Sequence, residues 1–119
     1  MLHVTFVRIS EEGASRLRSW LASLGSRRAE LAESYRRQNT RHERFYLLPG
    51  EDGPTLVVVS ESSNFDEGAR EFLRSEHPID REFKQIIQDG QGRELDAERV
   101  YDSRDFVSDP AEVFSGEEE

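Results

Sequence analysis

Cysteine is absent from this 119-residue sequence, which excludes disulfide bonds and metal sites built on thiolates. The sequence also has no apolar run near the roughly 20 residues that a membrane-spanning helix needs. Residues 1–7 have the alternation of a β-strand and lack the basic start of a secretory signal. We therefore expect a cytoplasmic protein that does not enter a membrane.

Lysine is nearly absent as well, since Lys84 is the one lysine among 16 basic residues. With 25 acidic residues the formal net charge is −9, which repels the phosphates of nucleic acids and of anionic lipids. We therefore expect no binding to nucleic acid or to membranes. An acidic, arginine-rich composition suits a high-salt cytoplasm, and it follows equally from a GC-rich genome.

The first half of the chain has the pattern of a strand followed by a long helix. Residues 2–9 alternate between two faces, with β-branched and aromatic side chains typical of a strand. Ser10 is a suitable cap for a helix over residues 11 to about 37. An apolar stripe at helical spacing supports this helix, formed by Leu17, Trp20, Leu21, Leu24, Leu31 and Tyr35. Gly25 within the stripe predicts a kink.

Two further strands are expected at residues 41–48 and 55–61. The segment between them, residues 49–54, is dense in glycine and proline, which predicts an antiparallel hairpin. Residues 56–59 form a continuous apolar run, which is typical of a central strand buried on both faces.

A second helical region follows the hairpin. Asn64 with Glu67 three residues later is close to a capping box, which predicts a helix start. Pro78 interrupts the pattern, so we expect two short helices broken at His77-Pro78. Glycines at residues 90 and 92 end the second of them.

The order strand–helix–strand–strand–helix–strand predicts an α+β, ferredoxin-like fold. Its four-stranded antiparallel sheet has the helices on one face, and its fourth strand is expected near residues 95–103. The domain covers residues 1–103, and residues 104–119 form an acidic C-terminal tail or arm. Because the open sheet face mixes apolar and polar side chains, we expect a homodimer formed through the sheet faces.

His42 and Tyr46 are the leading candidates for a catalytic or ligand-binding site. Side chains four residues apart on a strand share a face, and an imidazole beside a phenol can transfer a proton or bind a polar ligand. Alternatively, His42 is a strand-end histidine bonded to a backbone carbonyl. Glu43 and His77 are further candidate ligand-binding residues. Tyr101 either points into the cavity or closes the edge of the core. The three histidines lack metal-ligand spacing, so neither a metal site nor a cofactor is expected.

The order of elements, the size and the mixed sheet face resemble the dimeric α/β-barrel superfamily of ferredoxin-like proteins. More narrowly, the string Arg41-His42-Glu43, the string Tyr46-Leu47-Leu48 and the segment 77–84 resemble a family of small prokaryotic proteins of unknown function. The superfamily includes small monooxygenases without dedicated cofactors, haem-degrading enzymes and sugar mutarotases. Such analogy does not by itself establish a reaction.

Three functions stay open at this point. The favoured one is a dimeric domain that binds a small molecule in a cavity over the sheet face. The resemblance implies an alternative, a cofactor-free enzyme of the monooxygenase or isomerase kind that uses His42 and Tyr46. The third is a non-catalytic structural or interaction module, whose cavity would be filled by apolar side chains.

Overall fold

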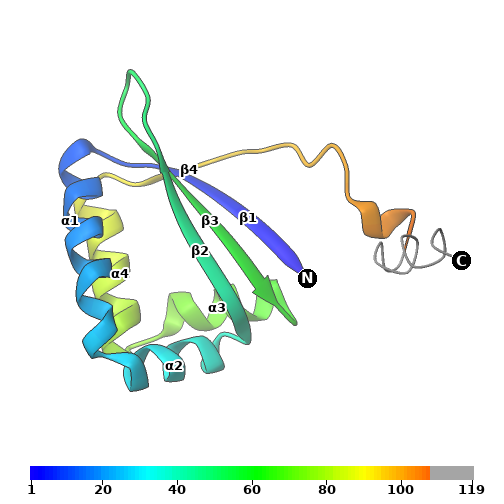
Figure 1. Cartoon of the computed structure of the whole chain (residues 1–119), viewed down its shortest axis with the longest axis horizontal. Helices are drawn as coiled ribbons and strands as arrows, with labels where there is room; N and C mark the ends of the chain where they lie inside the picture. Colours follow the sequence, from blue (N-terminus) through cyan, green and yellow to red (C-terminus); the bar gives the residue numbers. More distant parts are fainter. Residues whose placement is uncertain (108–119) are drawn as a thin grey trace, which may run out of the picture.

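A computed structural model of the chain describes residues 1–107 and shows one antiparallel sheet packed against helices (Figure 1). The strands are β1 (Leu2–Arg8), β2 (Thr40–Leu48), β3 (Thr55–Ser62) and β4 (Arg93–Leu95). The helices are α1 (Glu11–Ser23), α2 (Arg28–Arg37), α3 (Phe65–Arg74) and α4 (Pro78–Asp89), and 3₁₀ turns lie at Leu24–Ser26 and Ser103–Asp105. No helix within this range is long and apolar enough to cross a membrane.

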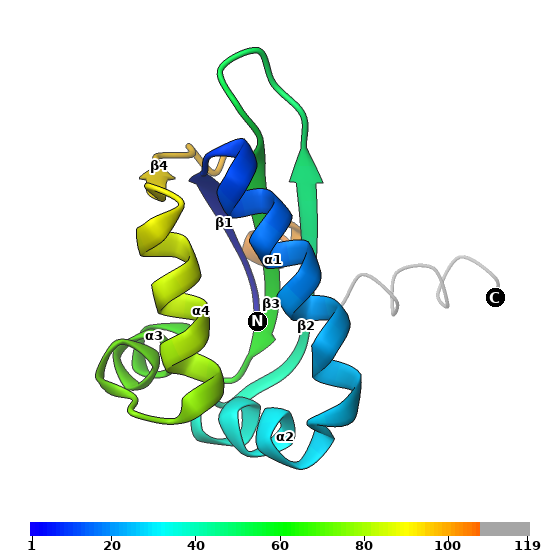
Figure 2. The ribbon, with the colours of Figure 1, turned by 90° about the vertical axis from the view of Figure 1, so that its left-hand side faces the viewer.

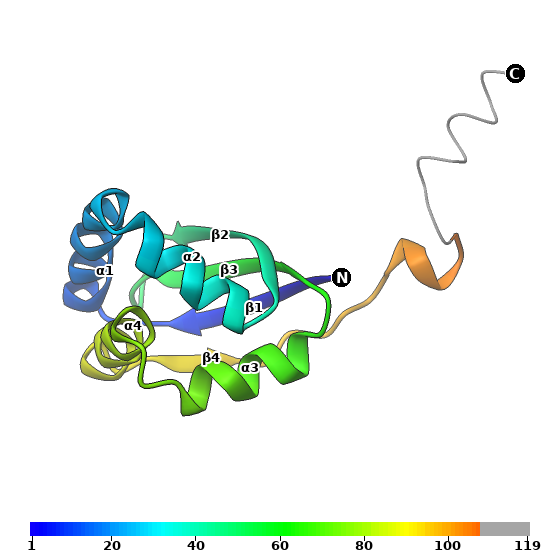
Figure 3. The ribbon, with the colours of Figure 1, turned by 90° about the horizontal axis from the view of Figure 1, so that it is seen from below.

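The strands follow the order β2-β3-β1-β4 across the sheet, and every neighbouring pair is antiparallel. The four α-helices all lie on the same face of the sheet (Figure 2, Figure 3). This order and layering confirm the α+β class and the ferredoxin-like arrangement predicted from the sequence. The hairpin of β2 and β3 and the break between α3 and α4 are also confirmed.

The predicted long helix over residues 11–37 is two helices. The kink expected at Gly25 is a full break, where the 3₁₀ turn Leu24–Ser26 separates α1 from α2. Helix α1 runs beside α4, whereas α2 turns across one end of the sheet (Figure 1, Figure 2). Because of this break, α1 lies along one side of the space over the sheet and α2 lies along another.

The fourth strand is shorter and earlier than predicted. It covers Arg93–Leu95 instead of residues 95–103, and it pairs only with Phe6–Arg8 of β1. Residues 96–99 are mostly charged and offer no apolar alternation that would hold them against the sheet. The rest of the β1 edge therefore has no strand partner within residues 1–107. Most of the predicted acidic tail, residues 108–119, lies outside the described residues.

Glycine allows the close approach of α1 and α4. A Cβ atom on Gly13 would lie 2.8 Å from the Cα atom of Gly90, closer than two such atoms can pack. Ser10 caps α1 by accepting a hydrogen bond from the Gly13 amide at 3.0 Å. Beneath these helices a small core is buried, formed by Ile9, Ala14, Leu17, Leu56 and Ile86. The core is small because the helices leave much of the space over the sheet unfilled.

The opposite face of the sheet carries no α-helix within the described chain, although the 3₁₀ turn Ser103–Asp105 lies on this side (Figure 1, Figure 3). Large apolar side chains are nevertheless exposed there, at Leu2 (70%), Val4 (43%), Tyr46 (49%) and Leu48 (52%). We call this surface the bare face. Its mixed character agrees with the sequence pattern that predicted a partner.

Candidate functional site

A cleft of about 650 Å³ lies between the sheet and the four α-helices. Its volume falls within the roughly 300–1,000 Å³ that is typical of small-molecule sites. Most of the lining is apolar and comes from β1, β2, β3 and all four helices, including Val7, Leu21, Leu31, Leu56, Val58, Ala69, Ile79 and Ile87. Polar side chains gather mainly where α2 ends and α4 begins. The cleft therefore has an apolar body and a polar end.

Four aromatic side chains form one wall of the cleft, with Phe83 of α4 at its centre. The Phe83 ring centroid lies 5.7 Å from that of Trp20, 5.4 Å from Phe45 and 5.8 Å from Phe72. These separations suit favourable aromatic pairs. Since the rings come from α1, β2, α3 and α4, they hold three helices against the sheet around the cleft.

Glu43 is the main polar group on the sheet side of the cleft. The register of the hairpin pairs it with Ser60, whose hydroxyl donates to the Glu43 carboxylate at 2.9 Å. Burial raises the pKa of the Glu43 carboxyl, and the hydroxyls of Ser60 and Tyr35 offset part of that shift. Burial likewise raises the pKa of the Tyr35 phenol, which lies near the Glu43 charge. No described basic side chain contributes to the Glu43 shift. Glu43 thus has hydroxyl donors but no positive partner.

Asp80 is the second carboxylate at the polar end, and its hydrogen bonds are already made. It lies in the first turn of α4 and is 2% exposed. Its Oδ1 atom accepts from the Ser34 hydroxyl at 2.5 Å and from the Gln38 side-chain amide at 3.1 Å. Ser34 and Gln38 both come from the end of α2. Asp80 therefore joins α2 to α4, and its arrangement is structural.

Helix α3 closes one side of the cleft and is held at both ends. Near its start, a Cβ atom on Gly68 would lie 2.3 Å from the backbone oxygen of Gln38, so only glycine allows this approach to α2. At its other end, the Lys84 ammonium donates to three backbone oxygens, those of Phe72, Leu73 and Ser75, at 3.0, 3.1 and 2.9 Å. These contacts fix α3 with its apolar side chains toward the cleft.

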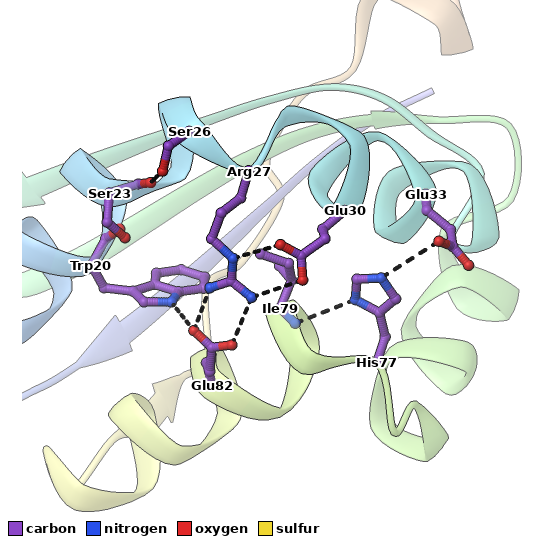
Figure 4. Close-up of polar contacts among 9 residues, drawn as sticks. All are labelled: Trp20, Ser23, Ser26, Arg27, Glu30, Glu33, His77, Ile79 and Glu82. Carbon is purple, nitrogen blue, oxygen red and sulfur yellow. Dashed lines mark hydrogen bonds and ion pairs between the residues drawn. The ribbon is translucent and has the colours of Figure 1, made fainter.

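A charged network lies on the solvent side of α1, α2 and α4 (Figure 4). Glu82 accepts hydrogen bonds from the Trp20 indole at 2.9 Å and from the Arg27 guanidinium at 2.6 and 2.9 Å. Arg27 also donates to Glu30 at 2.8 and 3.1 Å. The Arg27 hydrogen bonds hold the pKa of Glu82 and of Glu30 below the usual range of a glutamate. This network links the three helices from outside the cleft.

His77, a predicted site residue, caps the start of α4. Its Nδ1 atom accepts from the Ile79 amide at 3.3 Å, and Pro78 occupies the first helical position (Figure 4). Its Nε2 atom lies 3.9 Å from a Glu33 carboxylate oxygen. His77 thus contributes to helix geometry and does not line the cleft.

Of the other predicted residues, the structure brings Glu43 to the cleft but not His42, Tyr46 or Tyr101. His42 and Tyr46 lie on the bare face, while Glu43 between them points to the helix side. His42 lines a hollow of about 230 Å³ together with Leu2, Arg44, Val59 and Glu61. Tyr101 lies in the segment after β4, is 68% exposed and stacks on Phe106. The chemical roles of His42 and Tyr46 stay predictions.

Glu43 is a site residue predicted from the sequence, but its neighbours Tyr35 and Ser60 are not. Tyr35 belongs to the predicted apolar stripe of the helix, and Ser60 lies within a predicted strand. The hairpin register was the signal that could have paired Glu43 with Ser60. Within residues 1–107, no group of three or more histidine or acidic side chains could hold a metal ion.

Comparison with protein families gives a match over nearly the whole described chain. The model of a family of unknown function (DUF6176) matches residues 2–106. No curated protein and no solved structure matches the sequence. The geometry of the cleft is therefore the main guide to function.

Proposed function

The chain belongs to the family of unknown function DUF6176, and we propose that its function is to bind a small, largely apolar molecule in the cleft between the sheet and the helices. The observation that carries this proposal is the composition of the cleft wall. Four aromatic rings form one wall of the cleft, and a few convergent polar groups lie at one end. This combination is the usual composition of a ligand site. A cleft kept only for packing would be filled by its own side chains.

Trp20 provides a direct test, because it is the one tryptophan of the chain and lines the cleft. Neutral single-ring compounds, 2-phenylethanol among them, should change its fluorescence saturably. They should also raise the melting temperature, since a ligand of the folded state stabilises it by mass action. A panel of such compounds that gives neither saturation nor a shift would refute the proposal.

A matched pair of substitutions separates binding in the cleft from binding elsewhere. Ala69 of α3 lines the cleft, whereas Ala32 of α2 is exposed to solvent. Ala69→Leu should weaken the saturable response by narrowing the cleft. Ala32→Leu adds the same atoms outside and should leave the response unchanged.

The bare face supports a second part of the proposal, a homodimer formed through the sheets. Its exposed apolar side chains are more extensive than a solvated sheet face needs. In such a dimer His42 and Tyr46 would face the partner copy, so their use in proton transfer or ligand binding depends on this assembly. It also corresponds to the arrangement that the dimeric α/β-barrel resemblance implies.

Light scattering coupled to size exclusion tests the dimer. The expected mass is twice the 13.7 kDa of one chain. Val4→Asp on the bare face should return it to one chain, whereas Ala32→Asp on the outside of α2 should not. A monomer at tens of micromolar for the unmodified protein would contradict the dimer without affecting the cleft.

A further inference from the structure

The charged side chains that line the cleft are unbalanced. They are three carboxylates and one ammonium group, from Glu43, Asp80, Glu94 and Lys84. Lys84 directs its ammonium at three backbone oxygens of the α3 end, which uses all the donors that an ammonium has. No other of the 16 basic residues lines the cleft within the described part of the chain. Within the described residues, the cleft therefore offers an anionic ligand no free cationic partner.

Glu43 is the carboxylate best placed to meet a ligand. Asp80 is buried and already accepts two hydrogen bonds, which join α2 to α4. Glu94 is exposed on the short strand β4, so water screens its charge. Glu43 lies on the covered face of the sheet, and its carboxylate accepts a hydrogen bond from the Ser60 hydroxyl. Its charged form lacks a positive partner inside the described structure.

The distance from Glu43 to the aromatic wall sets the size of the ligand. Phe45 lies two residues beyond Glu43 on the same face of β2, which corresponds to roughly 7 Å along a strand. The Phe45 ring is 5.4 Å from that of Phe83. A ring packed against these two side chains could place a nitrogen at Glu43 through a linker of two or three carbons.

From this placement we infer that the cleft prefers a protonated amine joined by a short linker to a single ring, with Glu43 as the partner of the amine. The ammonium group would supply the positive charge that Glu43 lacks and form a charge-assisted hydrogen bond. The ring would pack on the aromatic wall, whose faces also attract a cation. This inference rests on the proposed ligand-binding function and specifies its ligand class.

Three ligands of similar size test the preference: 2-phenylethylamine, 2-phenylethanol and 3-phenylpropanoate. Their affinities at neutral pH can be measured by Trp20 fluorescence and by calorimetry. The amine should bind about tenfold more tightly than the alcohol, or more, and the carboxylate most weakly. Equal affinity of amine and alcohol would overturn the amine preference and leave the proposed function intact. If none of the three binds, the proposed function itself fails.

Two glutamine variants test whether Glu43 is the partner. Glu43→Gln should bring the amine affinity to within about threefold of the alcohol affinity, because the charge is lost while the shape is kept. Binding of the alcohol to this variant shows that the cleft is still formed. Glu51→Gln, at an exposed glutamate in the loop between β2 and β3 outside the cleft, is the matched control and should keep the preference. If Glu43→Gln leaves the preference intact, the assignment to Glu43 is wrong.

Discussion

Two glutamates of this chain lie on opposite sides of the same helices, and their surroundings differ. Glu82 lies outside, where Arg27 and Trp20 donate to it and its pKa is lowered. Glu43 lies inside, where hydroxyl groups donate to it, no basic side chain among residues 1–107 approaches it and its pKa is raised. The outer glutamate thus stabilises the folded chain in its charged form, whereas the inner one opposes folding in that form.

Under the proposed function, the outer network stabilises the fold, whereas the inner carboxylate awaits a ligand. If a buried carboxylate served only for packing, an apolar or amide side chain could take its place with little loss of stability. Side chains that lower the stability of the fold are concentrated at functional sites, where a bound ligand supplies the interaction that the protein does not make. The outer network needs no ligand, because its charges are already paired. The following predictions test this contrast, beginning with the largest expected effect.

Trp20→Ala should give the largest loss, because Trp20 belongs to both regions. Its ring stacks on Phe83 in the cleft wall, and its indole donates to Glu82 in the network. We expect a loss of about 3 kcal/mol in the free energy of unfolding, measured with urea. Trp20→Phe keeps the ring and removes the donor, so it should cost about 1 kcal/mol. Equal losses for the two variants would mean that the stacked ring contributes little.

Ser34→Ala should cost about 1–3 kcal/mol, because it removes a hydrogen-bond donor from the buried Asp80 carboxylate. Ser19→Ala on the exposed side of α1 is the control and should be nearly neutral. Urea unfolding of both variants provides the comparison. A neutral Ser34→Ala would show that the junction of α2 and α4 does not depend on Asp80.

Glu43→Gln should change stability in the opposite direction at neutral pH. Because the folded pKa of Glu43 is raised, its cost is absent below the unfolded glutamate pKa and grows as the pH rises through the folded value. The charged and titratable groups facing it are Tyr35 of α2 and Asp80 of α4, and both remain in the variant. The gain over the unmodified protein should therefore increase from pH 4 to pH 8. A gain that is constant with pH would contradict the assignment.

Arg27→Met should give the smallest change, because the network is partly open to solvent, and the reverse dependence on pH. Since the folded pKa of Glu82 is lowered, the pair stabilises the protein above the unfolded glutamate pKa and loses this effect as the pH falls through the folded value. The variant should thus be less stable at pH 7, and the difference should shrink on acidification. Arg28→Met, at an exposed arginine beside it, serves as the control.

Local signals explain why much of the fold could be predicted. Ser10 and Asn64 cap helices as expected, and Pro78 begins α4, because capping and proline geometry act over a few residues. The break at Leu24–Ser26 was foreseen only as a kink, since the stripe of apolar residues continues through it. The fourth strand was predicted too late in the sequence, because β4 holds only one apolar residue, Leu95, after the charged Arg93 and Glu94.

The candidate site reverses the usual pattern of a strand, in which apolar side chains face the helices and charged side chains face away from them. Glu43 is charged but faces the helices, whereas Tyr46 and Leu48 are apolar in character but lie on the bare face. Alternation along β2 puts Glu43 on one face of the sheet and Tyr46 and Leu48 on the other, but it does not show which face the helices cover. The approach of α2 that brings Tyr35 to Glu43 is a tertiary arrangement, and no spacing along the chain encodes it.

The contrast between the inner and outer glutamates can be measured in one experiment. Carbon-13 NMR titration of the side-chain carboxyl groups reports both residues, and the variants Glu43→Gln and Glu82→Gln identify their signals. We expect Glu43 to titrate above the ordinary glutamate pKa of 4.5 and Glu82 below it. A Glu43 midpoint at or below 4.5 would show that this carboxyl is not left without a positive partner, and the assignment of the cleft to a cationic ligand would be wrong.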